Sequence, residues 1–141
     1  REVECAVLGN DFPKASAVGE VIPKSSFYTF ENKYIDEGGA VLDIPAKLTQ
    51  QEVERIQELA IETYRLLECE GMSRVDMFLT PEGKLYINEI NTIPGFTKIS
   101  MYPKLWEISG LAYKDLITTL IELAIESNDN RNALVQADTE Q

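Results

Sequence analysis

Residues 73–91 read SRVDMFLTPEGKLYINEIN, and this stretch decides the fold because it predicts a β-hairpin. Two runs rich in apolar, β-branched and aromatic residues flank Pro81-Glu82-Gly83, whose residue types are typical of a tight turn. We take Glu82-Gly83 as a two-residue turn, which sets the antiparallel register of the two strands.

In that register Asp76 faces Glu89 and Arg74 faces Asn91, and all four side chains share one face of the sheet. Directly opposed Cβ atoms lie about 4.5 to 5.5 Å apart, so two carboxylates placed there repel each other unless a cation lies between them. Carboxylate and amide oxygens suit Mg²⁺, so the pattern predicts a metal site for phosphoryl transfer. The alternative is a solvated sheet face with an Arg–Asp ion pair.

The segment after the hairpin adds two further signals. Pro94-Gly95 predicts a turn whose glycine permits a close approach of the backbone to a ligand. Ser100 and the backbone N–H groups near Met101 then begin a helix, where an anion is stabilised. The alternative for Ser100 is a plain helix N-cap.

The rest of the chain predicts an α+β domain over residues 1–126. Thr49-Gln50-Gln51-Glu52 has the capping-box pattern that begins a helix. We expect an antiparallel sheet with its helices packed on one face, and residues 127–141 as a frayed, disordered tail. The expected strands are 2–9, 16–22, 27–30, 74–80 and 84–90, and the expected helices are 50–68, 102–109 and 113–126.

The composition excludes several classes of function. The net charge of −11 argues against a nucleic-acid partner, and no apolar run reaches the length of a membrane span. The chain contains no histidine, which excludes Ser-His and Cys-His nucleophiles and imidazole zinc sites built by this chain alone. Its two cysteines show no C-x-x-C spacing, which favours a reducing cytoplasm.

Four stretches together resemble the C-terminal half of the D-alanine–D-alanine ligases of the ATP-grasp superfamily. They are RVDMF (74–78), NEINTIPGFT (88–97), Ser100 and ENKY (31–34), and the resemblance extends over residues 1–126. In that family ATP phosphorylates the carboxylate of a first D-alanine, and the amine of a second D-amino acid attacks the acyl phosphate. The dipeptide serves peptidoglycan synthesis in the cell wall.

The resemblance implies a role for each residue of the hairpin. Asp76 and Glu89 would hold one Mg²⁺ on the ATP phosphates, and Glu89 and Asn91 a second, with Mn²⁺ as an alternative ion. Arg74 and the backbone N–H of Gly95 correspond to the oxyanion donors.

Further residues match the substrate and nucleotide sites of the family. Ser100 corresponds to the group that receives the carboxylate of the second D-amino acid. Lys33 corresponds to a mobile-loop lysine that reaches the transferred phosphate, and Phe27 to an apolar wall of the adenine pocket. Tyr34 indicates peptide rather than depsipeptide formation, because depsipeptide-forming ligases usually have a histidine in this loop. Asn88 departs from the apolar adenine neighbour of some members.

The resemblance also implies that this chain is a piece of a longer enzyme and is inactive alone. The domain that binds the first D-alanine and the lysines that grip ATP have no counterpart in it. Family members are commonly homodimers. Two alternatives stay open: a D-alanine–D-serine ligase, and a non-catalytic ATP-grasp-like binding module.

Overall fold

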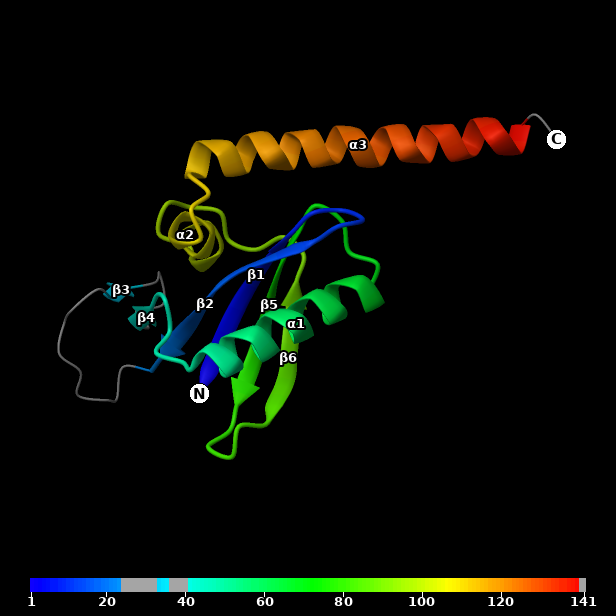
Figure 1. The fold of residues 1–141 in the computed structure, drawn as a ribbon. Coiled ribbons are helices and arrows are strands. Elements are labelled where there is room, and N and C mark those ends of the chain that lie inside the picture. Colours follow the sequence, from blue (N-terminus) through cyan, green and yellow to red (C-terminus); the bar gives the residue numbers. More distant parts are fainter. Residues whose placement is uncertain (24–32, 36–40, 140–141) are drawn as a thin grey trace.

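The fold is a six-stranded antiparallel sheet with three helices, seen in a computed structural model that describes residues 1–23, 33–35 and 41–139 (Figure 1). The strand order across the sheet is β3-β4-β2-β1-β5-β6. This confirms the predicted α+β class. The elements are β1 (Glu2–Leu8), β2 (Lys14–Ile22), β3 (Lys33–Ile35), β4 (Val41–Asp43), α1 (Gln50–Leu66), β5 (Met72–Leu79), β6 (Leu85–Asn91), α2 (Met101–Ile108) and α3 (Tyr113–Thr139).

The helices cover both faces of the sheet, so the prediction that they pack on one face is wrong. Successive residues of a strand point to opposite faces, and those of the central strand β1 join two separate cores. Val3, Cys5 and Val7 pack with the buried side of α1, whereas Ala6 and Leu8 pack with α2 and the start of α3. A strand covered on both faces is apolar at nearly every position, and β1 is buried throughout after Glu2.

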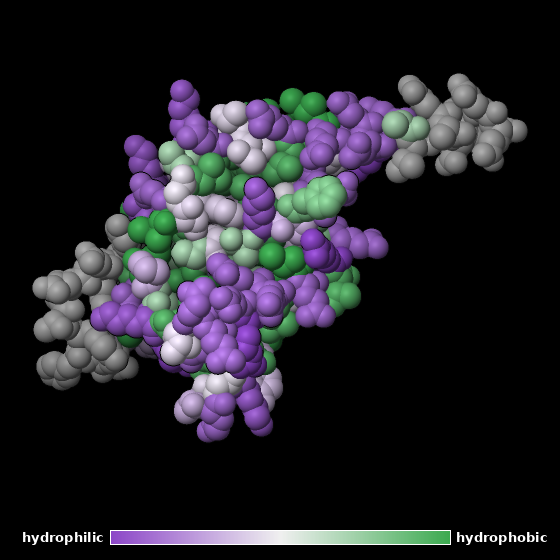
Figure 2. All heavy atoms as spheres, in the orientation of Figure 1, coloured by the Kyte–Doolittle hydropathy of each residue, from purple (hydrophilic) through white to green (hydrophobic). Residues whose placement is uncertain are grey.

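Helix α1 begins as the sequence predicts. The Thr49 hydroxyl accepts a hydrogen bond from the Glu52 N–H, and the Glu52 carboxylate accepts one from the Thr49 N–H, which completes the capping box. Ile56, Ala60 and Tyr64 are fully buried against the sheet. The outward side of the helix is charged, and Figure 2 shows hydrophilic side chains over it.

Helix α3 is longer than predicted, because it continues to Thr139 where we expected an irregular tail after Glu126. Neither glycine nor proline occurs after Gly110, so no helix breaker ends it. The Asn10 amide donates to the Leu123 carbonyl (3.0 Å), and the Glu70 carboxylate accepts from Ser127 and pairs with Arg131 (2.6 Å each). Beyond these contacts the helix extends past the sheet (Figure 1).

Two further predictions concern strands and membranes. The expected strand 27–30 lies outside the described residues, while the short strands β3 and β4 were not expected.

Among the helices that the structure describes, none combines the length and the apolar character needed to cross a bilayer.

Candidate active site

The hairpin of β5 and β6 has the predicted pairing at its functional residues. Asp76 lies opposite Glu89, and Arg74 lies opposite Asn91. The predicted turn, however, is wrong by one residue, because Thr80 pairs with Lys84 and leaves a three-residue loop that ends at Gly83 (φ 77°).

A β-bulge in β6 offsets this one-residue shift in register, so the predicted pairing is restored at Asp76. Met77 pairs with Ile87 while Asp76 pairs with Glu89, so Asn88 is the extra residue of β6. Without the bulge the ladder would place Asn88 opposite Asp76. The extra residue therefore brings Glu89, rather than Asn88, opposite Asp76.

Arg74 lies between two buried carboxylates on this face. Its Nε and Nη2 atoms donate to the two carboxylate oxygens of Asp76 at 2.7 Å each, and its Nε lies 3.0 Å from a carboxylate oxygen of Glu4 on β1. The hydrogen bonds to Asp76, followed by the charges of Glu4, Asp76 and Glu89, raise the pKa of Arg74 above its usual value against the opposing effect of burial. The guanidinium is therefore charged at every working pH.

The chemistry of the three predicted metal ligands fits a hard divalent cation. They offer two carboxylates and one amide oxygen, and Mg²⁺ usually takes one or two protein carboxylates and completes its octahedron with water and phosphate. Asp76 is 3% exposed, while Glu89 opposite it is exposed. No group of three or more His, Cys, Asp or Glu side chains suited to a metal ion occurs among the described residues.

The loop after β6 brings Gly95 and Ser100 together. The Ser100 hydroxyl accepts from the Thr97 N–H (3.0 Å) and shares a hydrogen bond with the Thr97 hydroxyl (2.9 Å). A methyl group added at Gly95 would lie 3.1 Å from the Ser100 hydroxyl oxygen, so a larger residue there would require this hydroxyl to shift by a few tenths of an ångström. Ser100 precedes α2 but makes no side-chain capping bond, which argues against the plain N-cap interpretation.

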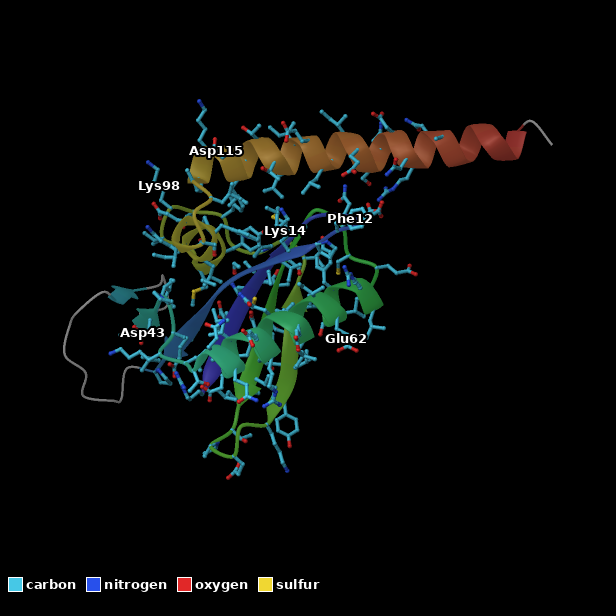
Figure 3. The ribbon with its side chains drawn as sticks, viewed as in Figure 1. Phe12, Lys14, Asp43, Glu62, Lys98 and Asp115 are labelled. Carbon is cyan, nitrogen blue, oxygen red and sulfur yellow. The ribbon has the colours of Figure 1, made fainter. Side chains whose placement is uncertain are left out.

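Aromatic residues hold this loop against α2 and α3. The Tyr113 hydroxyl donates to the Phe96 carbonyl (3.0 Å), and the Phe96 ring packs on Tyr113 and Tyr102 with centroid separations of 5.5 and 5.9 Å. Lys98 in the same loop points outward (Figure 3). The loop is thus anchored at Phe96 while Gly95 and Thr97 beside it stay exposed.

The family model described as "D-ala D-ala ligase C-terminus" matches residues 1–122. The chain belongs to this ligase family. Curated D-alanine–D-alanine ligases from Shouchella clausii and Oceanobacillus iheyensis are 62% and 60% identical over 134 residues, or 95% of the chain. The match covers 36% and 37% of those proteins, so the chain spans just over a third of their length.

Solved structures agree with this family assignment. The D-alanine–D-alanine ligase from Coxiella burnetii is 45% identical, with a TM-score of 0.85 over 97% of this chain and 35% of that one. The VanG D-Ala:D-Ser ligase from Enterococcus faecalis is 42% identical, with a TM-score of 0.75 over 86% of this chain and 35% of that one. The sequence-based family prediction is therefore confirmed.

The remaining predicted site residues of this ligase domain differ in how far the structure places them. Asn88 is the exposed bulge residue. Phe27 lies outside the described residues. The backbones of Lys33 and Tyr34 pair with Asp43 and Leu42 in β3 and β4, and their side chains lie outside the described part. Figure 3 shows Asp43 on β4, where it is 7% exposed.

Glu4 is the site residue that sequence analysis of the ligase domain missed. It lies opposite Asp76 on β1, is 6% exposed, and contacts Arg74. The only signal was an acidic residue in a strand that is otherwise apolar from Val3 to Leu8. Its placement needed the pairing of β1 with β5, which the hairpin alone does not define.

Proposed function

We propose that the whole protein is an ATP-dependent ligase that joins D-alanine to a second D-amino acid through an acyl phosphate. The observation that carries this proposal is the placement of Arg74, Asp76, Glu89 and Asn91 on one sheet face. The resemblance implies that these residues hold the metal ions on the ATP phosphates, and the relatives named D-alanine–D-alanine ligase support the same activity.

We assign the Mg²⁺ ions of the reaction to Asp76, Glu89 and Asn91. Mg²⁺ bound there supplies positive charge to the phosphate groups of ATP. Each Asp76 oxygen accepts one hydrogen bond from Arg74 in this structure and keeps a lone pair for a cation. A cation bound there would weaken the Arg74–Asp76 pair, because its charge repels the guanidinium.

Arg74 and Gly95 are assigned to the oxyanion of the tetrahedral intermediate. The guanidinium and the backbone N–H of Gly95 are fixed donors, and such a donor lowers the barrier by about 3 to 4 kcal/mol. Ser100 is assigned to the carboxylate of the second D-amino acid, with Thr97 holding its hydroxyl in place. The resemblance also implies the roles of three further residues. Lys33 contacts the transferred phosphate, Tyr34 selects an amine as the attacking group, and Phe27 forms a wall of the adenine pocket.

The test measures ATP-dependent phosphate release by the whole protein with Mg²⁺ and D-Ala, and in parallel with D-Ser, D-lactate or L-Ala. Glu89→Gln removes a metal ligand, whereas Glu82→Gln removes an acid from the exposed turn of the same hairpin. We expect Glu89→Gln to lose more than tenfold in kcat, since losing a ligand of the metal costs more than about 1.4 kcal/mol. Glu82→Gln should stay within twofold.

Failure would take a recognisable form. If protein that binds ATP releases no phosphate with any D-substrate, the chain belongs to a non-catalytic binding module or to a ligase with other substrates. If Glu89→Gln keeps more than a tenth of the activity, the metal assignment is wrong.

A D-alanine–D-serine ligase is the second candidate. The similarity to the VanG D-Ala:D-Ser ligase, at 42% identity, favours this possibility. A steady-state comparison of kcat/KM for D-Ala and D-Ser as second substrate separates the two activities. The family resemblance implies a homodimer in the cytoplasm, with peptidoglycan as the destination of the dipeptide. The two free cysteines are consistent with a reducing compartment.

A further inference from the structure

Glu4 is a buried carboxylate with no role in the mechanism above. It lies on β1 opposite Asp76 and is 6% exposed. Its carboxylate oxygen is 3.0 Å from Nε of Arg74, the same nitrogen that donates to Asp76 at 2.7 Å. One guanidinium thus pairs with two carboxylates from neighbouring strands.

The strand order gives Glu4 a different position from the metal ligands. β1 and β6 lie on opposite sides of β5, so the rows of Glu4 and Glu89 are two strand spacings apart, or about 10 Å. Glu4 therefore lies beside Arg74 and is not one of the assigned metal ligands Asp76, Glu89 and Asn91.

A cation bound at Asp76 would disturb the pair that this structure shows. It would share the Asp76 oxygens that now accept from Arg74 and draw negative charge from them, and its own charge would repel the guanidinium. Because a buried charge that loses its partner is strongly destabilising, Arg74 needs a second carboxylate in reach. Glu4 already supplies one.

We propose that Glu4 is a positioning residue that holds the Arg74 guanidinium when Asp76 binds the metal ion. This inference rests on the proposed ligase function. Glu4 touches neither the substrate nor the metal, and acts through Arg74 alone. A merely structural Glu4 would affect stability but not the catalytic contribution of Arg74.

The test compares Glu4→Gln with Glu20→Gln in the whole protein. Glu20 is a matched control, since it is a strand carboxylate paired with Arg1 at 2.7 Å, with 14% of its side chain exposed against 8% for Glu4. We expect Glu4→Gln to lower kcat at least tenfold with the KM for D-Ala within threefold, because Arg74 acts on the intermediate. Glu20→Gln should leave both within twofold.

A double-mutant cycle with Arg74→Lys shows whether Glu4 acts through Arg74. If it does, Glu4→Gln should lower kcat less than threefold in the Arg74→Lys background, because residues that act as a unit are not additive. An undiminished loss in that background would overturn the inference, as would a Glu4→Gln protein with kcat within twofold of the wild type.

A titration with Mn²⁺ gives a readout independent of turnover. In Glu4→Gln the guanidinium keeps only Asp76, so Mn²⁺ should bind at least fivefold more weakly than in the wild type or in Glu20→Gln. Equal Mn²⁺ affinities of Glu4→Gln and the wild type would overturn the inference, whether or not the protein turns over. A lack of D-Ala-dependent turnover would by itself refute the ligase function. If Glu4→Gln does not fold, Glu4→Asp, which keeps the charge but shortens the reach, should show the same loss of kcat and the same coupling to Arg74.

Discussion

Replacing Arg74 with lysine tests the geometry of the site most directly. The arginine makes three close contacts: two with Asp76 at 2.7 Å and one with Glu4 at 3.0 Å. A lysine ammonium is a single point of charge and cannot reproduce the planar fork. It keeps a contact with one carboxylate and leaves the other buried without the arginine.

The size of the effect follows from these contacts. Each charge-assisted hydrogen bond contributes about 1.5 to 3 kcal/mol, and losing one such bond should lower the free energy of unfolding by that amount. Loss of an oxyanion donor should add about 2.7 to 4 kcal/mol to the catalytic barrier, which lowers kcat by a factor of about 10² to 10³. The expected rise in the catalytic barrier is therefore about 1 kcal/mol larger than the expected loss in the free energy of unfolding.

Arg1→Lys provides the control. Arg1 donates to Glu20 in the same two-nitrogen pattern, at 3.0 and 2.7 Å, but its side chain is 37% exposed. Since an exposed ion pair is worth at most about 1 kcal/mol, Arg1→Lys should change neither kcat nor the denaturation midpoint noticeably. Phosphate release and urea denaturation of the whole protein measure both quantities. An Arg74→Lys enzyme that keeps more than a tenth of kcat would refute the oxyanion assignment.

Three other substitutions or treatments test the loop and the core. Gly95→Ala places a methyl group 3.1 Å from the Ser100 hydroxyl oxygen, so we expect about a tenfold loss of kcat/KM for the second D-amino acid with less than about 1 kcal/mol of stability lost. Tyr64→Phe removes the buried hydrogen bond to the Gly9 carbonyl (2.7 Å) and should lower the free energy of unfolding by about 1 to 3 kcal/mol in urea denaturation. Burial raises the pKa of the Cys5 thiol to about 12, so maleimide at pH 7.5 should label Cys5 only after unfolding.

Matched residues control these measurements. Tyr86→Phe removes a hydroxyl from a side chain that is 54% exposed, and should leave stability unchanged where Tyr64→Phe lowers it. Cys69, which is partly exposed, should react with maleimide before denaturant is added. Rapid labelling of both thiols in the native protein would contradict the buried position of Cys5.

The pKa of Cys5 also predicts a pH dependence of stability. The thiol is protonated in the folded protein up to about pH 12, whereas in the unfolded chain it ionises near its ordinary value of 9.0. Its contribution to stability is therefore complete below pH 9 and is lost as the pH rises toward 12. Cys5→Ala should flatten this part of the stability curve, and an unchanged slope would refute the argument.

The sequence was sufficient where a local rule decides the structure. The capping box at Thr49 follows from residue types three positions apart, and the hairpin follows from two apolar runs around a turn. Both predictions were confirmed. The end of α3 was not predicted correctly, since apolar periodicity fades after Glu126 although nothing in the sequence breaks the helix.

Long-range pairing limits what one sequence can predict about the site. The neighbour of Asp76 on β1 is Glu4, which lies more than 70 positions away along the chain, and no local pattern links the two residues. The same limit explains the error about the helices: only the pairing of β1 between β2 and β5 makes it a central strand, and a central strand can be covered on both faces.

The predicted pairing of Asp76 with Glu89 is correct, although the two-residue turn from which it was predicted is not present. A three-residue loop in place of a two-residue turn would have shifted the pairing by one residue, and a shift of one moves every side chain of β6 to the other face. Glu89 and Asn91 would then point toward α1, and Asp76 would face Asn88. The bulge at Asn88 adds one residue and restores the pairing before the site begins. The loop length and the bulge therefore depend on each other. Removing one loop residue, or removing the bulge residue, should move Glu89 out of its position opposite Asp76 even though neither carboxylate is itself replaced.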